Sequence, residues 1–391
     1  MRLAENVELK FRKLFNQDPL IIRSPGRVNL IGEHTDYNMG FVLPAAIDKA
    51  IYFAIAPRND YDCRVFAMDM NEEFKFGIQN LKKSEKGWPN YLMGVVEQLV
   101  IAGCNLKGFD CVFGGDIPIG AGLSSSAALE AGLAFALNHI FNLGIDNLTL
   151  VKMAQNGENE FVGVKCGIMD QFINIFGKYG NVLRIDCRSL EFNYFPFNYP
   201  NISIVLFDTR ITHSLAASEY NRRRKECAEG VAKIQKNFSQ VHSLRDVSAD
   251  LLNEYKTKLD RTIFKRCKYV VEENCRLLNA CNALEKHDLT AFGSLMYKTH
   301  EGLSKDYEVS CKELDYLVYL TMNNPNVFGS RMMGGGFGGC TINLIENNFI
   351  ESVTNTVAVE YKKKFNLETK IYITKISNGT SIIDVNYNAK T

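Results

Sequence analysis

A glycine- and serine-rich stretch, Ile117-Pro-Ile-Gly-Ala-Gly-Leu-Ser-Ser-Ser-Ala-Ala-Leu129, constrains the fold more than any other part of the sequence. An apolar run over residues 109–117 precedes it, and apolar residues recur at helical spacing after it, at Leu129, Leu133, Leu137 and Ile140. The pattern predicts a strand, a glycine turn and a helix N-terminus, where unpaired N–H groups and the helix dipole favour a phosphate group. A plain turn with a serine N-cap is the simpler alternative, but three serines are more than a cap requires. We therefore expect a phosphate site here.

The composition is that of a globular protein with room for two domains. The chain has 391 residues, 46% hydrophobic and 23% charged, with a net charge of +1, so no overall field favours nucleic acid or an acidic membrane. No run reaches the roughly 18 apolar residues of a membrane span, and the charged N-terminus does not resemble a signal peptide. The 11 cysteines include no C-x-x-C pair, which argues against a disulfide framework or a zinc site. We expect a cytoplasmic protein, with Cys111, Cys275 and Cys281 as small core residues.

The order of the predicted elements separates a mixed first half from a mostly helical second half. In the first half we expect helices over 6–16, 90–102 and 150–161, strands over 20–22, 42–65 and 181–186, and a loop over 163–169 leading to Asp170. In the second half we expect strands over 202–207, 340–345 and 370–376, and helices over 218–236, 251–259, 262–286, 288–304 and 312–322. The basic runs 222–225 and 362–364 are expected to be solvated helix faces. No low-complexity linker separates the halves, so a cleft at their interface is the expected site.

A second glycine motif, Gly334-Gly-Gly-Phe-Gly-Gly339, fits G-x-G-x-x-G in form only. The dinucleotide fingerprint follows a strand and opens a helix, whereas this motif precedes the strand predicted over 340–345. Protein-kinase H-R-D and D-F-G sequences and a Walker P-loop are also missing from the sequence. The motif indicates close approach either by a ligand or by another backbone segment.

Residues 24–37 are rich in charged groups that a surface turn does not need. Glu33 and Asp36 are carboxylates of the kind that accept hydrogen bonds from sugar hydroxyls, although a solvated loop is the alternative, and His34 can be a purely structural histidine. Asp170 is flanked by apolar residues in Cys166-Gly-Ile-Met-Asp-Gln171 and needs a partner, for which Arg27 is the candidate.

These motifs resemble those of a known family. Gly26-Arg-Val-Asn-Leu-Ile-Gly-Glu-His-Thr-Asp-Tyr-Asn38 resembles the signature of galactokinases. Residues 118–129 and 333–340 resemble the phosphate loop and the third motif of the wider superfamily of galactokinase, homoserine kinase, mevalonate kinase and phosphomevalonate kinase (GHMP kinases). The motifs occur in the family's order over residues 20–340. Only the first of them separates galactokinases from the other members.

The resemblance implies an α+β fold of two domains with the site in the cleft between them. The N-terminal domain, 1–198, would be similar to ribosomal protein S5, and the C-terminal domain, 199–391, would be ferredoxin-like with extra helices. The implied activity is ATP-dependent phosphorylation of the C1 hydroxyl of α-D-galactose with Mg²⁺. The implied partners are galactose and MgATP, with no nucleic acid or membrane, and the chain would be a monomer or a weak homo-oligomer.

The resemblance also implies roles for individual residues. Asp170 and Arg27 would be the catalytic pair, with Asp170 either a general base or only an orienting group. The sugar would be held by Glu33, His34, Thr35, Asp36, Gly167 and Tyr220. The nucleotide phosphates would be held by Gly120, Ala121, Gly122, Leu123, Ser124, Ser125 and Ser126. Ser126 and Glu158 would be the magnesium ligands, since both offer hard oxygen donors.

Two residues depart from the family pattern, and two other functions remain open. Met39 stands where the family usually has glycine, and Met333 stands where threonine is common. A kinase for N-acetylgalactosamine or another galactose derivative is the nearest alternative enzyme. A non-catalytic sugar sensor on the same fold is the alternative outside enzymes. The uninterrupted serine run and the presence of both Arg27 and Asp170 favour an enzyme.

Overall fold

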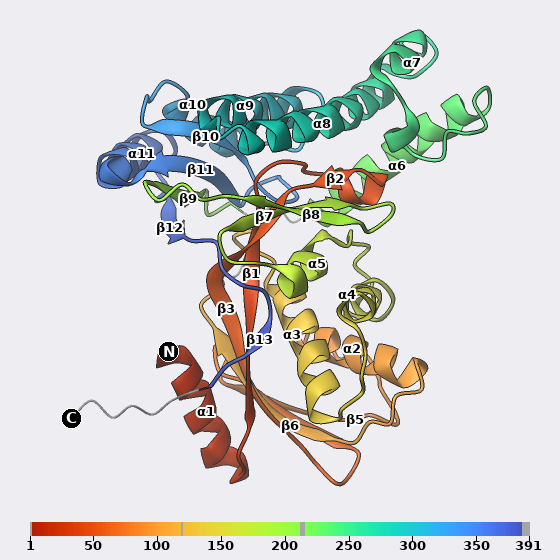
Figure 1. The fold of residues 1–391 in the computed structure, drawn as a ribbon, viewed down its shortest axis with the longest axis vertical. Helices are drawn as coiled ribbons and strands as arrows, with labels where there is room; N and C mark the ends of the chain where they lie inside the picture. Colours follow the sequence, from red (N-terminus) through yellow and green to blue (C-terminus); the bar gives the residue numbers. More distant parts are fainter. Residues whose placement is uncertain (1, 119, 212–215, 385–391) are drawn as a thin grey trace.

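Three β-sheets organise the computed structural model, which describes residues 2–118, 120–211 and 216–384 (Figure 1). The six-stranded sheet has the order β13-β1-β3-β6-β4-β5 and consists of β1 (Leu20–Asn29), β3 (Pro44–Pro57), β4 (Asp62–Ala67), β5 (Glu72–Gly77), β6 (Phe109–Gly115) and β13 (Ser381–Ile382). The four-stranded antiparallel sheet has the order β10-β11-β9-β12 and consists of β9 (Ile202–Asp208), β10 (Val327–Met332), β11 (Cys340–Glu346) and β12 (Lys370–Thr374). A small sheet joins β2 (Phe41–Val42), β7 (Asn181–Asp186) and β8 (Phe192–Pro196).

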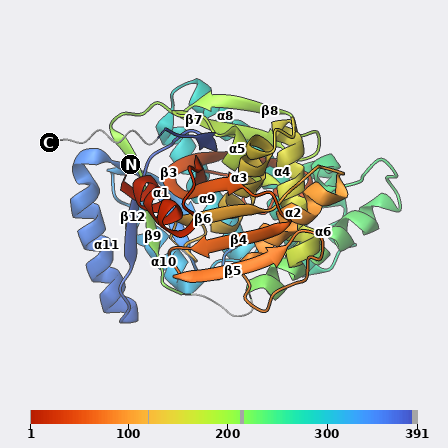
Figure 2. The ribbon, with the colours of Figure 1, turned by 90° about the horizontal axis from the view of Figure 1, so that it is seen from below.

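The helices cover these sheets in two groups. The first group comprises α1 (Arg2–Phe15), α2 (Pro89–Ile101), α3 (Ser125–Ile140), α4 (Asn147–Asn156) and α5 (Met169–Phe176). The second comprises α6 (Ala216–Gln235), α7 (Ala249–Glu254), α8 (Arg261–Glu285), α9 (Leu289–Lys305), α10 (Lys312–Met322) and α11 (Ile350–Phe365). Figure 1 shows α8, α9 and α10 above the four-stranded sheet, and α2 to α5 beside the six-stranded sheet. Seen from below in Figure 2, α11 and α6 lie at opposite sides of the molecule. Among the described residues, no helix is long and apolar enough to cross a membrane.

Helix α3 is the central element of the first half, and its predicted apolar face is confirmed. Leu129, Leu133 and Leu137 are buried against the six-stranded sheet. At Gly132 the helix backbone comes so close to the sheet that an added Cβ would lie 2.6 Å from the Phe53 ring. The strand predicted before the phosphate loop is also confirmed, as β6. The loop is therefore held between a central strand and a closely packed helix.

Three expectations from the sequence are wrong in detail. The short strand over 20–22 continues to Asn29 as β1, because a register shift between Pro25 and Arg27 accommodates the missing N–H of proline. Asp170 does not follow a loop into strands but lies in the first turn of α5, where packing on α3 overrides the strand propensity of Phe172 and Ile173. Cys275 is exposed rather than buried in the core.

The domain boundary proposed at residue 198 lies between β8 and β9 and stays a prediction. The last strand crosses back to the first half, since Ile382 of β13 pairs with Ile22 of β1. Just before β13, the Thr380 hydroxyl donates a hydrogen bond of 2.6 Å to Oδ1 of Asn174 in α5. The Asn174 amide in turn donates to Ser24 of β1 at 3.0 Å. This buried polar cluster ties the C-terminal segment to the helix that carries Asp170.

Thr380→Val should lower the free energy of unfolding by roughly 1–3 kcal/mol, because it removes the shorter of the two hydrogen bonds that the buried Asn174 amide oxygen accepts, at nearly constant side-chain volume. Denaturant unfolding measures the change. Thr356→Val, at an exposed hydroxyl of α11, is the control and should change stability by less than about 0.5 kcal/mol. Equal effects of the two substitutions would contradict the role of the cluster.

Candidate active site

The first and third motifs predicted from the sequence line one cavity of about 380 Å³, and the phosphate loop contacts two of its lining residues, Arg27 and Asp170. Residues from β1, the segment after β1, the loop before α5, α5, α6 and the glycine-rich connection between β10 and β11 line the cavity. They are Arg27, Glu33, His34, Asp36, Gly163, Val164, Lys165, Cys166, Gly167, Met169, Asp170, Tyr220, Asn221, Gly334, Gly335 and Gly336. Both halves of the chain contribute, which agrees with a site at their interface.

The predicted pairing of Asp170 with Arg27 is confirmed. Arg27 Nε donates to Asp170 Oδ1 at 2.7 Å and Nη2 donates to Oδ2 at 2.8 Å, which is the bidentate geometry of a strong arginine–carboxylate pair. Burial would lower the pKa of Arg27, but the attraction of the Asp170 carboxylate outweighs burial and raises it. The Asp170 side chain remains 28% exposed, so the cavity gives access to its carboxylate.

The phosphate loop contacts this pair directly. Gly120 and Gly122 have φ of 79° and 71°, in the left-handed region that glycine favours. Arg27 donates through Nη1 to the carbonyl of Gly122, and at Gly26 an added Cβ would lie 2.9 Å from the carbonyl oxygen of Leu123. The glycine between Pro25 and Arg27 therefore lets the loop lie against β1.

The serines of the loop are not used as helix caps. Ser124 has φ 56° and its hydroxyl donates to Oδ2 of Asp170 instead of capping α3. Within the described chain, the hydroxyls of Ser125 and Ser126 have no side-chain or backbone partner. Two free hydroxyls at the N-terminus of a 16-residue helix fit a phosphate and a metal ion better than the simple N-cap does.

The Glu33 carboxylate is held between the two halves of the chain. Its Oε1 accepts from Arg331 Nη1 at 3.2 Å and from the backbone N–H of Gly334 at 2.7 Å, while Asn29 donates to Oε2 at 2.9 Å. Arg331 also donates to the carbonyls of Asn29 and Leu30, the latter at 2.8 Å. Sequence reasoning missed Arg331, since an arginine within an apolar strand gives no indication of a distant partner.

The third motif is both a tight hairpin and a wall of the cavity. It joins antiparallel strands β10 and β11, and added Cβ atoms at Gly336 and Gly338 would lie 2.2 Å from the carbonyl oxygens of Val309 and Ile211 respectively. Gly334, Gly335 and Gly336 line the cavity. Close approach by backbone, one of the two alternatives left open by the sequence, therefore applies to Gly336 and Gly338, while Gly334 and Gly335 leave room at the cavity wall.

The predicted sugar residues lie together, with one exception. Asp36 packs against Gly167, where an added Cβ would lie 1.7 Å from Asp36 Oδ2, so only glycine fits there. The Tyr220 ring lies 5.5 Å from the His34 ring. Thr35 is fully buried and does not line the cavity, because its hydroxyl donates to the carbonyls of Gly32 and Phe41.

Burial changes the protonation of two of these groups. It raises the pKa of Asp36 to about 6, with the nearby Asp170 adding to the shift. Burial also lowers the pKa of His34 to about 4, so the imidazole is neutral at pH 7. A neutral imidazole has one N–H donor and one acceptor, which suits a hydroxyl ligand.

Glu158 lies in a buried polar cluster beside the phosphate loop. It sits in the π-helical turn η2 (Gly157–Val162), and its Oε2 accepts from Gln171 at 2.7 Å and from the Cys166 thiol at 3.2 Å. Gln171 also donates to Glu130 of α3, whose pKa burial raises well above its usual value. Glu130 Oε1 is buried without a partner within the described residues. Sequence reasoning missed Glu130, although an acidic residue on the Ala/Leu-rich face of a helix was a usable signal.

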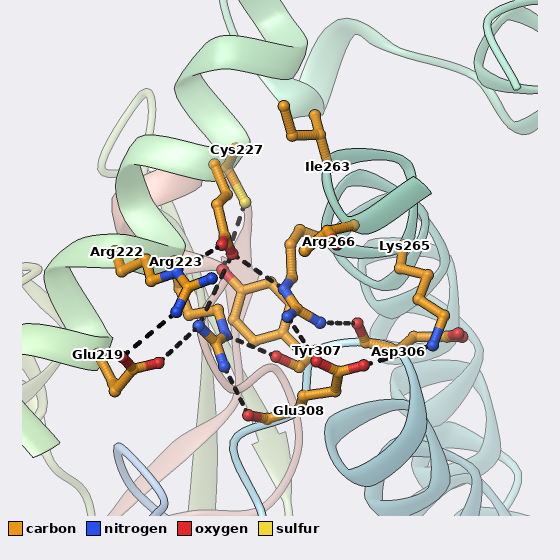
Figure 3. Close-up of polar contacts among 12 residues, drawn as sticks. Glu219, Arg222, Arg223, Cys227, Ile263, Lys265, Arg266, Asp306, Tyr307 and Glu308 are labelled. Carbon is orange, nitrogen blue, oxygen red and sulfur yellow. Dashed lines mark hydrogen bonds and ion pairs between the residues drawn. The ribbon is translucent and has the colours of Figure 1, made fainter. Parts of the chain in front are cut away.

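The basic run 222–225 is not a uniformly solvated face. Arg223 is 4% exposed and donates to the carbonyls of Tyr307 and Glu308, both at 2.7 Å (Figure 3). These two hydrogen bonds join α6 to the segment after α9, and Arg223 also forms an ion pair of 3.1 Å with Glu219 of its own helix. A run of charges on one helix did not show which member faces the interior.

Comparisons with known proteins agree with this architecture. The family descriptions that match are "GHMP kinases N terminal domain" over residues 90–178 and "GHMP kinases C terminal" over residues 282–353. A mevalonate kinase structure, 22% identical, shares the fold with a TM-score of 0.62 over 92% of this chain and 99% of that one. The fold is that of a GHMP kinase.

More specific matches identify the family within this class. The "Galactokinase galactose-binding signature" matches residues 9–57. A galactokinase of Roseiflexus sp. (strain RS-1) is 43% identical over 95% of both chains, and one of Clostridium beijerinckii is 41% identical over 95% of this chain and 96% of that one. The crystal structure of Lactococcus lactis galactokinase complexed with galactose has a TM-score of 0.93 at 32% identity, covering 98% of this chain and 100% of that one. The chain belongs to the galactokinase family and is a kinase.

Asp36→Asn should stabilise the protein more at pH 7.5 than at pH 5. Because burial raises the pKa of Asp36 from 3.8 to about 6, its contribution to stability is present below pH 3.8 and is lost as the pH rises through about 6. Asparagine avoids this loss, so the gain in unfolding free energy should be roughly 1–2 kcal/mol larger at pH 7.5 than at pH 5. Denaturant unfolding at both pH values measures it. Asp60→Asn is the control. Arg58 lowers the pKa of Asp60 to about 2, so this carboxylate is ionised at both pH values, and the effect of Asp60→Asn on unfolding free energy should be the same at both.

Met39→Gly should raise the free energy of unfolding by about 0.5–1 kcal/mol. Met39 has φ 58°, a conformation that is unfavourable for a side chain and that explains the usual glycine at this position. Thermal unfolding measures the gain. Met70 provides the control, because its side chain is 49% exposed, close to the 46% of Met39, and its φ is not positive. Met70→Gly should not raise the free energy of unfolding. A loss of stability in Met39→Gly would show that the methionine side chain contributes packing that outweighs the strain.

Proposed function

We propose that the chain transfers the γ-phosphoryl group of ATP to the C1 hydroxyl of α-D-galactose, giving ADP and α-D-galactose 1-phosphate, the first step of galactose use. The observation that carries this proposal is the Arg27–Asp170 pair, which contacts the phosphate loop on one side and the cavity on the other. A phosphoryl transfer needs its acceptor and donor sites to meet at one point, and this pair lies where they meet.

Asp170 and Arg27 would act on the reacting atoms. The Asp170 carboxylate accepts the proton of the C1 hydroxyl as its oxygen attacks phosphorus, the bond between phosphorus and the bridging oxygen of ADP breaks, and ADP leaves with that electron pair. Arg27 fixes the orientation of the carboxylate through both of its oxygens and places positive charge beside the transferred group.

The cavity offers hydrogen-bonding groups that match a hexose. Glu33, His34, Asp36 and Tyr220 would contact the sugar hydroxyls, with the backbone at Gly167 close to the same site. Thr35 would act by stabilising the turn with its hydroxyl rather than by contacting the sugar. The choice of galactose as the sugar is supported by the Lactococcus lactis galactokinase, whose crystal structure is a complex with galactose.

The loop of Gly120, Ala121, Gly122, Leu123, Ser124, Ser125 and Ser126 would hold the nucleotide phosphates at the N-terminus of α3. Ser126 and Glu158 would hold Mg²⁺, which when bound supplies positive charge to the phosphate oxygens. The free serine hydroxyl and the buried carboxylates of Glu158 and Glu130 are the donor set that such an ion prefers.

The remaining assignments concern the cellular setting. We propose a cytoplasmic enzyme that acts as a monomer or weak homo-oligomer on small molecules. All 11 cysteines are free thiols, a state that a reducing compartment maintains.

Purified protein with Mg-ATP and a panel of hexoses should release ADP much faster with galactose than with glucose or N-acetylgalactosamine. Preference for N-acetylgalactosamine would change the sugar assignment but keep the chemistry. Binding of galactose without ADP release above the sugar-free background would instead support a sugar sensor.

Asp170→Asn should lower kcat by roughly 10²- to 10⁴-fold, because the amide keeps the shape of the side chain but cannot accept the proton. Steady-state kinetics measure kcat, and galactose binding should persist. Asp60→Asn, at a carboxylate outside the cavity, is the control and should retain the wild-type rate. A kcat within tenfold of wild type for Asp170→Asn would show that Asp170 only orients the hydroxyl.

A further inference from the structure

A chain of side-chain hydrogen bonds runs from α6 to the sugar cavity through residues to which no role has been assigned. The Cys227 thiol contacts the Tyr307 hydroxyl at 3.3 Å, and the Tyr307 and Tyr37 hydroxyls are 2.9 Å apart. The Tyr37 hydroxyl lies 2.7 Å from Nδ1 of His34. The other ring nitrogen, Nε2, is buried, has no hydrogen-bond partner among the described residues, and belongs to a side chain that lines the cavity.

Contacts to its backbone and its ring, in addition to those of its hydroxyl, fix the position of Tyr307. Its segment is clamped by two buried arginines, Arg223 from α6 and Arg266 from α8 (Figure 3). Arg223 donates to the backbone carbonyls of Tyr307 and Glu308, while Arg266 donates to the carbonyl of Asp306 and pairs with the Glu308 carboxylate at 2.7 Å. The fully buried Tyr307 ring also packs 5.0 Å from the His34 ring. The hydroxyl of Tyr307 therefore has one fixed position.

The direction of the hydrogen bonds follows from the chemistry of the two ends. A phenol is a good donor to an imidazole nitrogen, whereas a thiol is a weak acceptor, so donation toward His34 is favoured over donation toward Cys227. Burial keeps the imidazole neutral by lowering the pKa of His34 to about 4, so the ring carries a single proton. Because Nδ1 accepts from the Tyr37 hydroxyl, that proton is on Nε2.

We propose that Tyr37 and Tyr307 are positioning residues that hold His34 as the Nε2–H tautomer, so that the imidazole presents a hydrogen-bond donor to a sugar hydroxyl. The tautomer of a histidine is set by the hydrogen bond that its other nitrogen makes. Asp36 and Glu33 are acceptors, so a hydroxyl that donates to one of these carboxylates still needs a donor for its own lone pair. Nε2–H supplies that donor, and the opposite tautomer would offer one more acceptor to a site that already has several.

Tyr307→Phe and Tyr37→Phe should each raise the KM for galactose roughly three- to tenfold, leaving the KM for ATP unchanged and kcat within about twofold. Both substitutions keep the ring packing and remove one hydroxyl. Tyr361→Phe is the matched control. Tyr361 is also fully buried, and its hydroxyl donates a hydrogen bond of 2.9 Å to a backbone carbonyl that is not part of the hydrogen-bond chain to His34. It should lower stability without changing the KM for galactose.

A double-mutant cycle separates positioning from a general effect on folding. In a His34→Gln background, where no imidazole tautomer exists, Tyr307→Phe should no longer change the KM for galactose. An equal rise in KM in both backgrounds would overturn the proposal and assign Tyr307 to packing alone.

The tautomer itself can be observed without any activity, which separates this inference from the proposed function on which its kinetic part rests. Two-bond ¹⁵N–¹H correlation spectra of protein labelled at its 6 histidines distinguish the two neutral tautomers, and His34→Gln identifies the relevant signals. Wild type should show the Nε2–H pattern, and Tyr37→Phe should shift the population toward Nδ1–H. An Nδ1–H pattern in wild type, or an unchanged pattern in Tyr37→Phe, would refute the proposal. Loss of galactose turnover together with the expected spectra would instead refute only the function.

Discussion

The buried guanidinium of Arg331 is the interaction on which the site depends. Burying an arginine costs several kcal/mol unless its donors are matched, and Arg331, 0% exposed, is matched by Glu33 and by the carbonyls of Asn29, Leu30 and Met332. Apart from Met332, its partners lie at the end of β1 and just beyond it, whereas Arg331 itself lies in β10. The segment after β1 is therefore held against the four-stranded sheet, and the walls of the cavity come from both.

Around this contact, glycines allow backbone segments to pack directly against one another. Gly122 of the phosphate loop and Gly334 of the third motif lie close together, since a Cβ on Gly334 would be 3.8 Å from Cα of Gly122. Gly26 and Gly167 allow similar approaches to Leu123 and Asp36. The charged groups can therefore lie within hydrogen-bond distance of one another while the cavity stays open. In the function proposed above, such a preformed arrangement would serve the positioning of reactants that phosphoryl transfer requires.

The sequence predicted the parts of the site that are local in the chain. The strand, glycine turn and helix around the phosphate loop follow from periodicity and turn chemistry, and the Arg27–Asp170 pair follows from the cost of an unpaired carboxylate. The sequence did not predict the roles of three residues whose partners are remote in the chain and whose neighbours in sequence are typical of a hydrophobic core: Glu130, Tyr307 and Arg331. The expectation of strands directly after Asp170 failed for a related reason, since packing on α3, and not propensity, makes α5 a helix.

The pairing of β13 with β1 has a consequence for synthesis on the ribosome. The sheet that begins at residue 20 acquires its edge strand only when residues 381 and 382 emerge, after every other element has been made. Contacts that span this much of the chain form slowly, so the nascent N-terminal half waits with an unpaired strand edge. Such an edge invites pairing with other chains, and the yield of native protein should therefore depend on the protection that β1 receives during translation.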